Sequence, residues 1–460
     1  MISYNGYEDT ITRVYDNKQE HVFEFWNELT DEEKKSLLDE LSDIDFQHLL
    51  SLYEKTKEDK PLPMDFQPAP YMPVPKTDDQ KKEYARAYDA GVELIKHGKV
   101  AAFVVAGGQG SRLGFDGPKG AFPVGPVSNK TLFQIHAEKI KKYSEKYGVI
   151  VPWLIMTSPA NHQDTVDFLK QHNWFGLHEE SVHLFPQKMI PSLDPDGKLV
   201  LADKHSIFKN PDGHGGSLTA LRQSGVLQKM IDQGIDIISY FQVDNSLVNI
   251  VDPYFIGFHV LQEARISSKA LMKAYPEEKV GVFVEFENGK IGVVEYSDLP
   301  EEKQYEKDDE GSLRYAAGSI AIHLFDCRFL MDITGGGSLS LPYHIAKKKI
   351  EEYTHEGKKE IQGFKFEKFV FDALPLTDNN FIMETTREEE FAPVKNKSGV
   401  DSVESARELM SNLAMNWLKK QGISIPPEVK VIEISPLQAV EPEDIDTNIN
   451  IPAREKVYIQ

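Results

Sequence analysis

The stretch VAAFVVAGGQGSRLGFDGPKG, residues 100–120, decides the fold of this 460-residue chain. Its first six residues form an unbroken apolar run of strand length, which is typical of a parallel strand buried on both faces. The rest is rich in glycine and carries two cations, Arg112 and Lys119. Ligands of open α/β sheets bind beyond the carboxyl ends of the strands, so the sequence predicts a binding loop here.

The composition of this loop indicates a phosphate ligand. Glycines let the backbone approach an anion and turn its N–H groups toward it, and the two cations add positive charge. Two common nucleotide motifs do not fit. Leu113 stands where the dinucleotide pattern needs a glycine, and no stretch provides the Gly-Lys-Ser/Thr of a P-loop. We therefore favour a phosphate-binding loop of another class over a plain structural turn.

The chain after this loop alternates between strand-like and helix-like patterns. This alternation predicts a mostly parallel sheet with right-handed crossovers. The predicted strands are 100–105, 151–156, 182–185 and 237–243, and the predicted helices are 132–147, 161–172 and 217–233.

Residues 269–324 carry a different pattern, with turn residues such as Asn288-Gly289 between strand-like segments. Asn-Gly is a hairpin signal, so we expect an antiparallel extension beside the parallel sheet. Its predicted strands are 280–286, 289–296 and 315–325. One more strand is predicted at 364–371, and residues 377–397 are predicted to be mainly loop.

Both ends of the chain depart from the α/β pattern. The first part is predicted to be helical, with a capping box at Thr30–Glu33, a proline-rich extended arm at 58–75 and a helix over 78–97. The last part should hold a helix at 402–421 and a small β-rich tail. The predicted division is a helical N-terminal region, an α/β core and a C-terminal unit, at 1–98, 99–397 and 398–460.

Composition excludes several classes of protein. The net charge of -21 disfavours nucleic acid as a partner, and any nucleotide site must be made locally positive. No apolar run is long enough for a membrane span, and residues 1–10 lack the layout of a signal peptide. The single cysteine, Cys327, is expected to be a buried apolar residue. We therefore expect a cytoplasmic protein. We also expect it to be either a monomer or a weak homodimer. The acidic run Glu388–Glu390 is expected to be exposed to solvent.

An ordered set of motifs over roughly residues 90–420 resembles the UDP-sugar pyrophosphorylases, and most of all the eukaryotic-type UDP-N-acetylhexosamine pyrophosphorylases. The motifs are Ala106–Gly114, Pro118–Gly120, Lys130–Ile135, Pro152–Thr157, Pro211–Gly216, Val243–Asn245, Val294–Ser297 and Glu367–Asp372. The resemblance implies a Rossmann-like, GT-A-like nucleotidyltransferase core with a mixed sheet. It also implies an enzyme that condenses UTP with a sugar 1-phosphate, with N-acetylglucosamine 1-phosphate favoured, and releases pyrophosphate.

The same resemblance implies roles for particular residues. The backbone of Ala106, Gly107 and Gly108 would hold uridine, while Gln187 and Gly213 would read the uracil base. Arg112, Lys119 and Lys395 would contact phosphates as catalytic cations, and Asp244 would bind Mg²⁺. The residues implied near the sugar are His214, Gly281, Glu295, Tyr296, Ser319, Phe369 and Phe371.

Several of these residues also have an ordinary structural interpretation. Asp244 could form a simple turn after its strand, and Glu295 could face solvent. Phe369 and Phe371 stand two apart on a predicted strand, where core packing is the default. His214 lies between glycines, so we expect it to be exposed to ligand rather than packed.

Two positions depart from the acetylhexosamine pattern, which puts the identity of the sugar in doubt. His214 stands where that family has Asn, and Ala316–Ser319 stands where it has Asn-Ala-Gly-Asn. Glucose 1-phosphate and galactose 1-phosphate are therefore open alternatives. A non-catalytic UDP-sugar sensor and an acidic scaffold without a nucleotide site are rivals from other classes.

Overall fold

The structure is a computed structural model that describes residues 1–57, 65–335 and 341–460. The chain divides into two compact units. The smaller comprises Met1–Pro63, Gln187–Gly216 and Leu341–Val370, and the larger comprises Met64–Pro186, Ser217–Ser340 and Phe371–Gln460. The division into three successive parts, at 1–98, 99–397 and 398–460, stays a prediction. The two compact units are each made of three separate stretches of chain.

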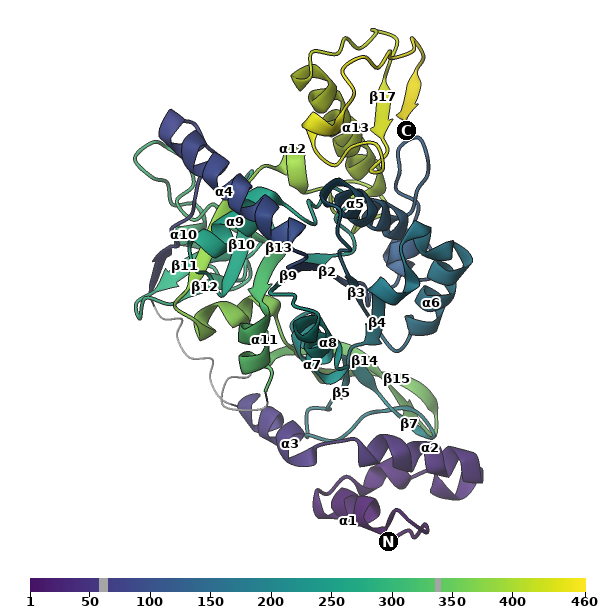
Figure 1. The fold of residues 1–460 in the computed structure, drawn as a ribbon. Coiled ribbons are helices and arrows are strands. Elements are labelled where there is room, and N and C mark those ends of the chain that lie inside the picture. The colour runs from purple at the N-terminus through teal and green to yellow at the C-terminus, as the bar shows by residue number, and fades with distance from the viewer. Residues whose placement is uncertain (58–64, 336–340) are drawn as a thin grey trace. The chain divides into compact units, whose positions relative to one another are not determined.

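A mixed sheet of ten strands organises the larger unit (Figure 1). Four of its strands are neighbours and run parallel, in the order β9-β2-β3-β4. They are β9 (Ile237–Gln242), β2 (Val100–Val105), β3 (Trp153–Thr157) and β4 (Val182–Pro186). The apolar runs in the sequence are therefore confirmed as the parallel part of the sheet.

The predicted antiparallel extension is also confirmed. It continues the sheet from β9 through β13 to β11 and includes the β11–β12 hairpin. The strands β10 and β16 were not predicted, and β16 lies in the segment that we expected to be loop. β1, which pairs with β11, lies in the stretch that we expected to be an extended arm. The added strands are β1 (Phe66–Pro68), β10 (Ile266–Met272), β11 (Val282–Phe286), β12 (Ile291–Val294), β13 (Ala317–Asp326) and β16 (Asn380–Thr385). Of the proline-rich arm, residues 58–64 lie outside the described residues.

The helices of the larger unit begin where the sequence carries capping residues. Thr77 and Gln80 form a capping box at the start of α4, an arrangement that contributes about 1 kcal/mol. The helix predicted over 217–233 is wrong as a single element, because Gly225, with φ +78°, separates α7 from α8. The helices are α4 (Asp78–Lys96), α5 (Leu132–Tyr147), α6 (His162–Gln171), α7 (Gly216–Gln223), α8 (Val226–Asp232), α9 (Pro253–Leu261), α10 (Glu301–Gln304), α11 (Cys327–Ile333), α12 (Arg387–Glu390) and α13 (Val403–Lys420).

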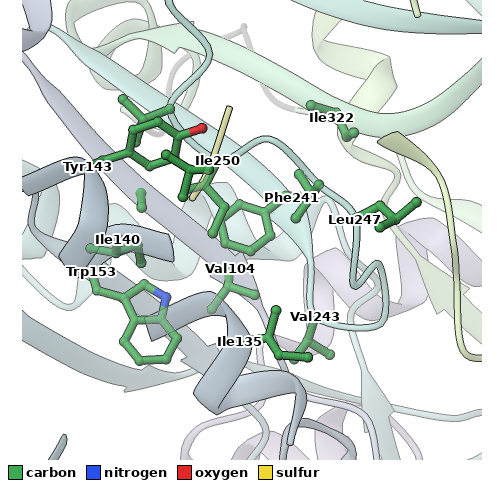
Figure 2. Packing of buried hydrophobic residues seen from close by; sticks show 14 of the residues in the cluster. Val104, Ile135, Ile140, Tyr143, Trp153, Phe241, Val243, Leu247, Ile250 and Ile322 are labelled. Atoms are coloured by element: carbon green, nitrogen blue, oxygen red, sulfur yellow. The ribbon is translucent and has the colours of Figure 1, made fainter. Parts of the chain in front are cut away.

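The core of the larger unit lies between the parallel strands and helix α5. Alternate residues of a strand point to one face, so Val104 of β2 and Phe241 of β9 meet Ile135 and Ile140 of α5 (Figure 2). Cys327 is buried, which raises the pKa of its thiol to about 12 and confirms it as a core residue. The C-terminal β unit, β17 (Val431–Ile434) with β18 (Lys456–Ile459), forms a separate small cluster with α13.

The smaller unit packs N-terminal helices against short strands and one long hairpin. Its apolar cluster joins α1, α2 and α3 to residues 190–207 and to the hairpin. The strand predicted over 364–371 is wrong beyond Glu367, where β15 ends, and the partner strand β14 was not predicted. The elements are α1 (Glu8–Asp16), α2 (Asp31–Ser42), α3 (Phe46–Lys55), β5 (Met189–Pro191), β6 (Leu201–Asp203), β7 (Ser206–Ile207), β8 (Lys209–Pro211), β14 (His344–Thr354) and β15 (Gly357–Glu367).

Candidate active site

The glycine-rich loop follows β2 as a compact turn held by its own backbone. The N–H of Gly110 donates to the carbonyl of Gly117 at 2.9 Å, and the N–H of Lys119 donates to the carbonyl of Gly108 at 3.1 Å. Two of its glycines serve packing, because a Cβ would lie 2.7 Å from Phe115 at Gly110 and 2.3 Å from Phe133 at Gly120. Gly108 is exposed, and the nearest atom to a Cβ there is Lys119 Cδ at 4.0 Å.

The structure brings Lys119 and Asp244 together at the ends of two neighbouring parallel strands. Lys119 Nζ lies 2.8 Å from Asp244 Oδ2, and the side chains are 16% and 17% exposed. Asp244 comes two residues after β9 and Lys119 belongs to the loop after β2. The sequence placed both residues at this edge of the sheet but gave no sign that they form an ion pair. Arg112, in the same loop, is exposed.

Helix α5 holds the segment that carries Asp244 from one side. His136 is fully buried, and its Nε2 donates to the carbonyl of Val243 at 2.9 Å. Burial lowers the pKa of His136 to about 3, so the ring is neutral at pH 7. One turn further on, Lys139 Nζ donates to the carbonyls of Ser246 and Val248, both at 2.8 Å. The backbone on either side of Asp244 is thereby fixed.

A second segment pairs with this one and positions Lys395. Asn245 is buried; its amide donates to the carbonyl of Glu390 at 2.8 Å and accepts from the N–H of Ala392 at 3.0 Å. The N–H of Val394 donates to the carbonyl of Asp244 at 3.0 Å. The Lys395 ammonium lies 3.5 Å from Asp401 and is half-buried, so it pairs with a different carboxylate from Lys119.

Beneath this pairing lies a buried ionic cluster that the sequence did not reveal. Lys269 Nζ lies 2.6 Å from Asp252 and 2.5 Å from Glu390, and all three side chains are buried. Burial lowers the pKa of Lys269, but the two carboxylates outweigh it and hold that pKa above its ordinary value. The expectation that the whole run Glu388–Glu390 is solvated is wrong at Glu390, which this cluster pulls into the interior.

Three of the residues predicted near the sugar gather on the antiparallel side of the larger unit. The N–H of Ser319 donates to the carbonyl of Gly281 at 2.8 Å. A Cβ on Gly281 would lie 3.0 Å from Glu295 Oε1. β13 runs antiparallel to β9, so its start, with Ser319, lies at the same edge of the sheet as Asp244. Tyr296 is 43% exposed.

The smaller unit holds another part of the predicted set around the turn 211–216. Here His214 is packed, which corrects the expectation of an exposed ring: it stacks on Phe369 with ring centroids 5.3 Å apart. Its Nδ1 accepts from the N–H of Val370 at 3.1 Å, and burial lowers the pKa of His214 to about 4. Gly213 has φ +84°, and a Cβ there would lie 2.4 Å from the Lys368 carbonyl.

The remaining predicted residues have other local settings. Gln187 is buried in the smaller unit. Phe369 follows the end of β15, and Phe371, in the larger unit, lies in the 3-10 helix Val370–Leu376. The premise that these two rings share one face of a strand is therefore wrong, because the strand has already ended.

Sequence reasoning missed Asn161, which the structure places against the glycine-rich loop. Its amide nitrogen donates to the carbonyls of Ala106 at 3.0 Å and Gly108 at 3.2 Å. The only available signal was that Asn commonly precedes a helix, and that signal predicts a cap for α6 rather than a contact with another loop.

Among the described residues, no group of three or more His, Cys, Asp or Glu side chains could hold a metal ion. No helix in the described parts of the chain is long and apolar enough to cross a membrane.

Comparison with known proteins agrees with this arrangement. Residues 46–440 match the model of the UTP–glucose-1-phosphate uridylyltransferase family. The chain is 35% identical over 457 residues to UDP-N-acetylglucosamine diphosphorylase 2 of Arabidopsis thaliana, covering 95% of this chain and 90% of that protein. It is also 35% identical to human UDP-N-acetylhexosamine pyrophosphorylase-like protein 1, with 95% and 94% covered.

Among solved structures, the chain is similar to uridine diphosphate N-acetylglucosamine pyrophosphorylase from Trypanosoma brucei, crystallised with an inhibitor. The TM-score is 0.84 at 29% sequence identity, and the alignment covers 100% of this chain and 99% of that one. The likeness extends over both compact units.

Proposed function

Because the chain belongs to the UTP–glucose-1-phosphate uridylyltransferase family, we propose that it condenses UTP with a sugar 1-phosphate, N-acetylglucosamine 1-phosphate being favoured. The products are a UDP-sugar and pyrophosphate. The observation that carries the proposal is the Lys119–Asp244 pair at the carboxyl ends of β2 and β9, the edge where open α/β sheets bind ligands.

The reaction needs alignment and charge neutralisation more than acid–base chemistry. An oxygen of the sugar phosphate attacks the α-phosphorus of UTP; a new P–O bond forms, and the bond to the β-phosphate oxygen breaks as pyrophosphate leaves. The attacking phosphate is already ionised near pH 7, so no general base is required. Cations held around the two anions lower the barrier by offsetting the charge that they bring together.

We assign that work to Lys119, Arg112 and Lys395. The Lys119 side chain is held by the Asp244 carboxylate, so its ammonium lies at the carboxyl ends of β2 and β9 before a ligand binds. Arg112 is exposed on the same loop and can turn toward phosphate. Lys395 comes two residues after Pro393, which pairs with Asn245, the neighbour of Asp244.

The donor chemistry of Asp244 fits Mg²⁺. Magnesium is often bound by one or two carboxylates together with substrate phosphates, and a single carboxylate at the strand edge suits that pattern. When bound, the ion would neutralise the phosphates further. Asp244 would hold the ion through its carboxylate, whose Oδ2 also accepts a hydrogen bond from the Lys119 ammonium at 2.8 Å.

The choice of sugar depends on Gly281, Glu295 and Ser319 in the larger unit. A Glu carboxylate and a Ser hydroxyl suit sugar hydroxyls. Glucose 1-phosphate remains the second candidate because Ser319 is shorter than the Asn of the acetylhexosamine pattern.

A pyrophosphate-release assay tests the proposal. The chain is incubated with UTP and Mg²⁺ and with N-acetylglucosamine, N-acetylgalactosamine, glucose or galactose 1-phosphate in turn. We expect turnover with the N-acetylglucosamine ester to exceed that with the others. Binding of UTP without turnover on the whole panel would instead support a UDP-sugar sensor, and no detectable UTP binding would support a scaffold.

A further inference from the structure

A role for Asn161 follows from its contacts and rests on the proposed function. Asn161 stands immediately before α6, the position at which an Asn side chain usually caps its own helix. Here it makes no capping hydrogen bond. The side chain is completely buried, and it is turned toward the glycine-rich loop more than fifty residues earlier in the chain.

All four hydrogen-bonding positions of the Asn161 amide are used. Nδ2 donates to the carbonyls of Ala106 and Gly108, while Oδ1 accepts from the N–H of Ser158 at 2.8 Å and from its hydroxyl at 3.0 Å. The backbone N–H of Ser158 can only donate, so it fixes which end of the amide carries the oxygen. The NH₂ group is thereby committed to the loop.

The two hydrogen bonds from Asn161 determine the direction in which the N–H groups of the glycine-rich loop point. In a trans peptide the carbonyl and the following N–H point in opposite directions. With the carbonyls of Ala106 and Gly108 turned to Asn161, the N–H groups of Gly107 and Gln109 are turned away from it. No hydrogen bond joins either N–H to a described residue, and both residues are at least partly exposed.

We infer that Asn161 is a positioning residue for the nucleotide: it sets the orientation of the two peptide groups whose N–H donors meet UTP. It touches neither substrate nor reacting atoms. Its removal should therefore weaken UTP binding selectively and leave the sugar phosphate largely unaffected.

Two variants separate this role from simple stability. Asn161→Asp has nearly the same shape but places an oxygen against the carbonyls of Ala106 and Gly108. The two hydrogen bonds are lost, and the oxygens repel one another. Asn161→Thr keeps one O–H donor and should be intermediate. The matched control is Thr165→Val in the same helix; Thr165 is fully buried and its hydroxyl donates only to the Asn161 carbonyl at 2.7 Å.

The measurements are steady-state kinetics with UTP and the preferred sugar 1-phosphate, the Kd of UTP by calorimetry, and thermal melting. For Asn161→Asp we expect the KM and Kd of UTP to rise about fivefold, as for one lost hydrogen bond to a ligand. The KM of the sugar phosphate should change less than twofold. Asn161→Thr should show a smaller rise, and Thr165→Val should lower the melting temperature without changing the KM of UTP.

The inference fails if Asn161→Asp folds and binds UTP like the unmodified chain, or if both Asn161 variants lose the folded state, which would make the residue purely structural. These outcomes leave the proposed function intact. Failure of the unmodified chain to bind UTP would remove the proposed function, and this inference with it.

Discussion

Two glycine-rich segments of this molecule look alike in sequence and differ in physical setting: the loop 106–120 of the larger unit and the turn 211–216 of the smaller. The loop is contacted by Asn161, which uses every hydrogen-bonding position of its amide, and its own Lys119 faces the Asp244 carboxylate. In the turn, Asp212 Oδ1 is buried with no hydrogen-bond partner among the described residues, and burial raises the pKa of Asp212 to about 6.

Glycine content therefore does not identify a phosphate site without further evidence. Glycines in both segments are required by close packing: Gly120 by a ring, Gly216 by the Asp212 carboxylate, which a Cβ would approach to 1.9 Å. What distinguishes the loop is the cation and the carboxylate at the ends of adjacent parallel strands.

Lys119→Ala tests the loop most directly. Losing a preorganised cation should lower kcat by about a thousandfold, since charge stabilisation in a site is worth a few kcal/mol. The measurement is pyrophosphate release at saturating substrates, with melting to verify the fold. Lys99→Ala, at the opposite end of β2 and paired with Asp236, is the control and should be nearly normal. Near-normal turnover of Lys119→Ala would remove our assignment of the loop.

Asp212→Asn tests the turn through stability. The folded-state pKa of about 6 exceeds the ordinary 3.8, so the folded chain binds more protons than the unfolded one between these values. Stability therefore falls as pH rises from about 4 to 6, by about 3 kcal/mol in total. The Asn variant should lack this loss, gaining stability at pH 7 but not below pH 4. Urea unfolding at both pH values measures it.

The exposed carboxylate of Asp196, in the same unit, supplies the matched control. Asp196→Asn should leave the free energy of unfolding nearly unchanged at both pH values. If Asp212→Asn shows the same pH dependence of unfolding as the unmodified chain, the buried Asp212 carboxylate does not destabilise the turn at pH 7.

Asp244→Asn tests the metal role of the strand-end carboxylate. An amide keeps the size but loses the charge, so the Mg²⁺ concentration for half-maximal rate should rise by roughly tenfold or more. Titration of activity with Mg²⁺ at fixed UTP measures the change. Asp401→Asn, which alters the partner of Lys395 instead, should leave that Mg²⁺ concentration almost unaltered. Equal metal requirements in all three chains would contradict the assignment.

His214→Asn and Ser319→Asn test the smallest effect, the preference between sugars. Each restores an amide of the acetylhexosamine pattern, and one added hydrogen bond is worth about 1 kcal/mol, or roughly fivefold. The kcat/KM ratio for N-acetylglucosamine 1-phosphate over glucose 1-phosphate should therefore rise severalfold. An unchanged ratio in both variants would mean that neither position reads the acetyl group.

Much of the fold was predictable because local patterns of apolar residues and capping residues determine where strands and helices form. Buried parallel strands leave continuous apolar runs, and capping residues mark helix starts, so β2, β9 and α5 were found directly. β14 and the first part of β15 were missed because their exposed, charged residues carry no clear alternation. Residues 217–233 read as one helix because a single glycine is tolerated inside a helical pattern.

The candidate site also has a part that local patterns predicted and a part that they did not. By itself the sequence determined which residue types stand at the ends of buried strands, and hence Lys119 and Asp244 as candidates, because strand ends are set by local periodicity. Only the tertiary structure decided that these two form an ion pair, that His214 stacks on Phe369, that Glu390 is buried with Lys269, and that Asn161 grips the loop. Those contacts join residues far apart in the chain, and no local pattern encodes which distant partner a side chain will meet.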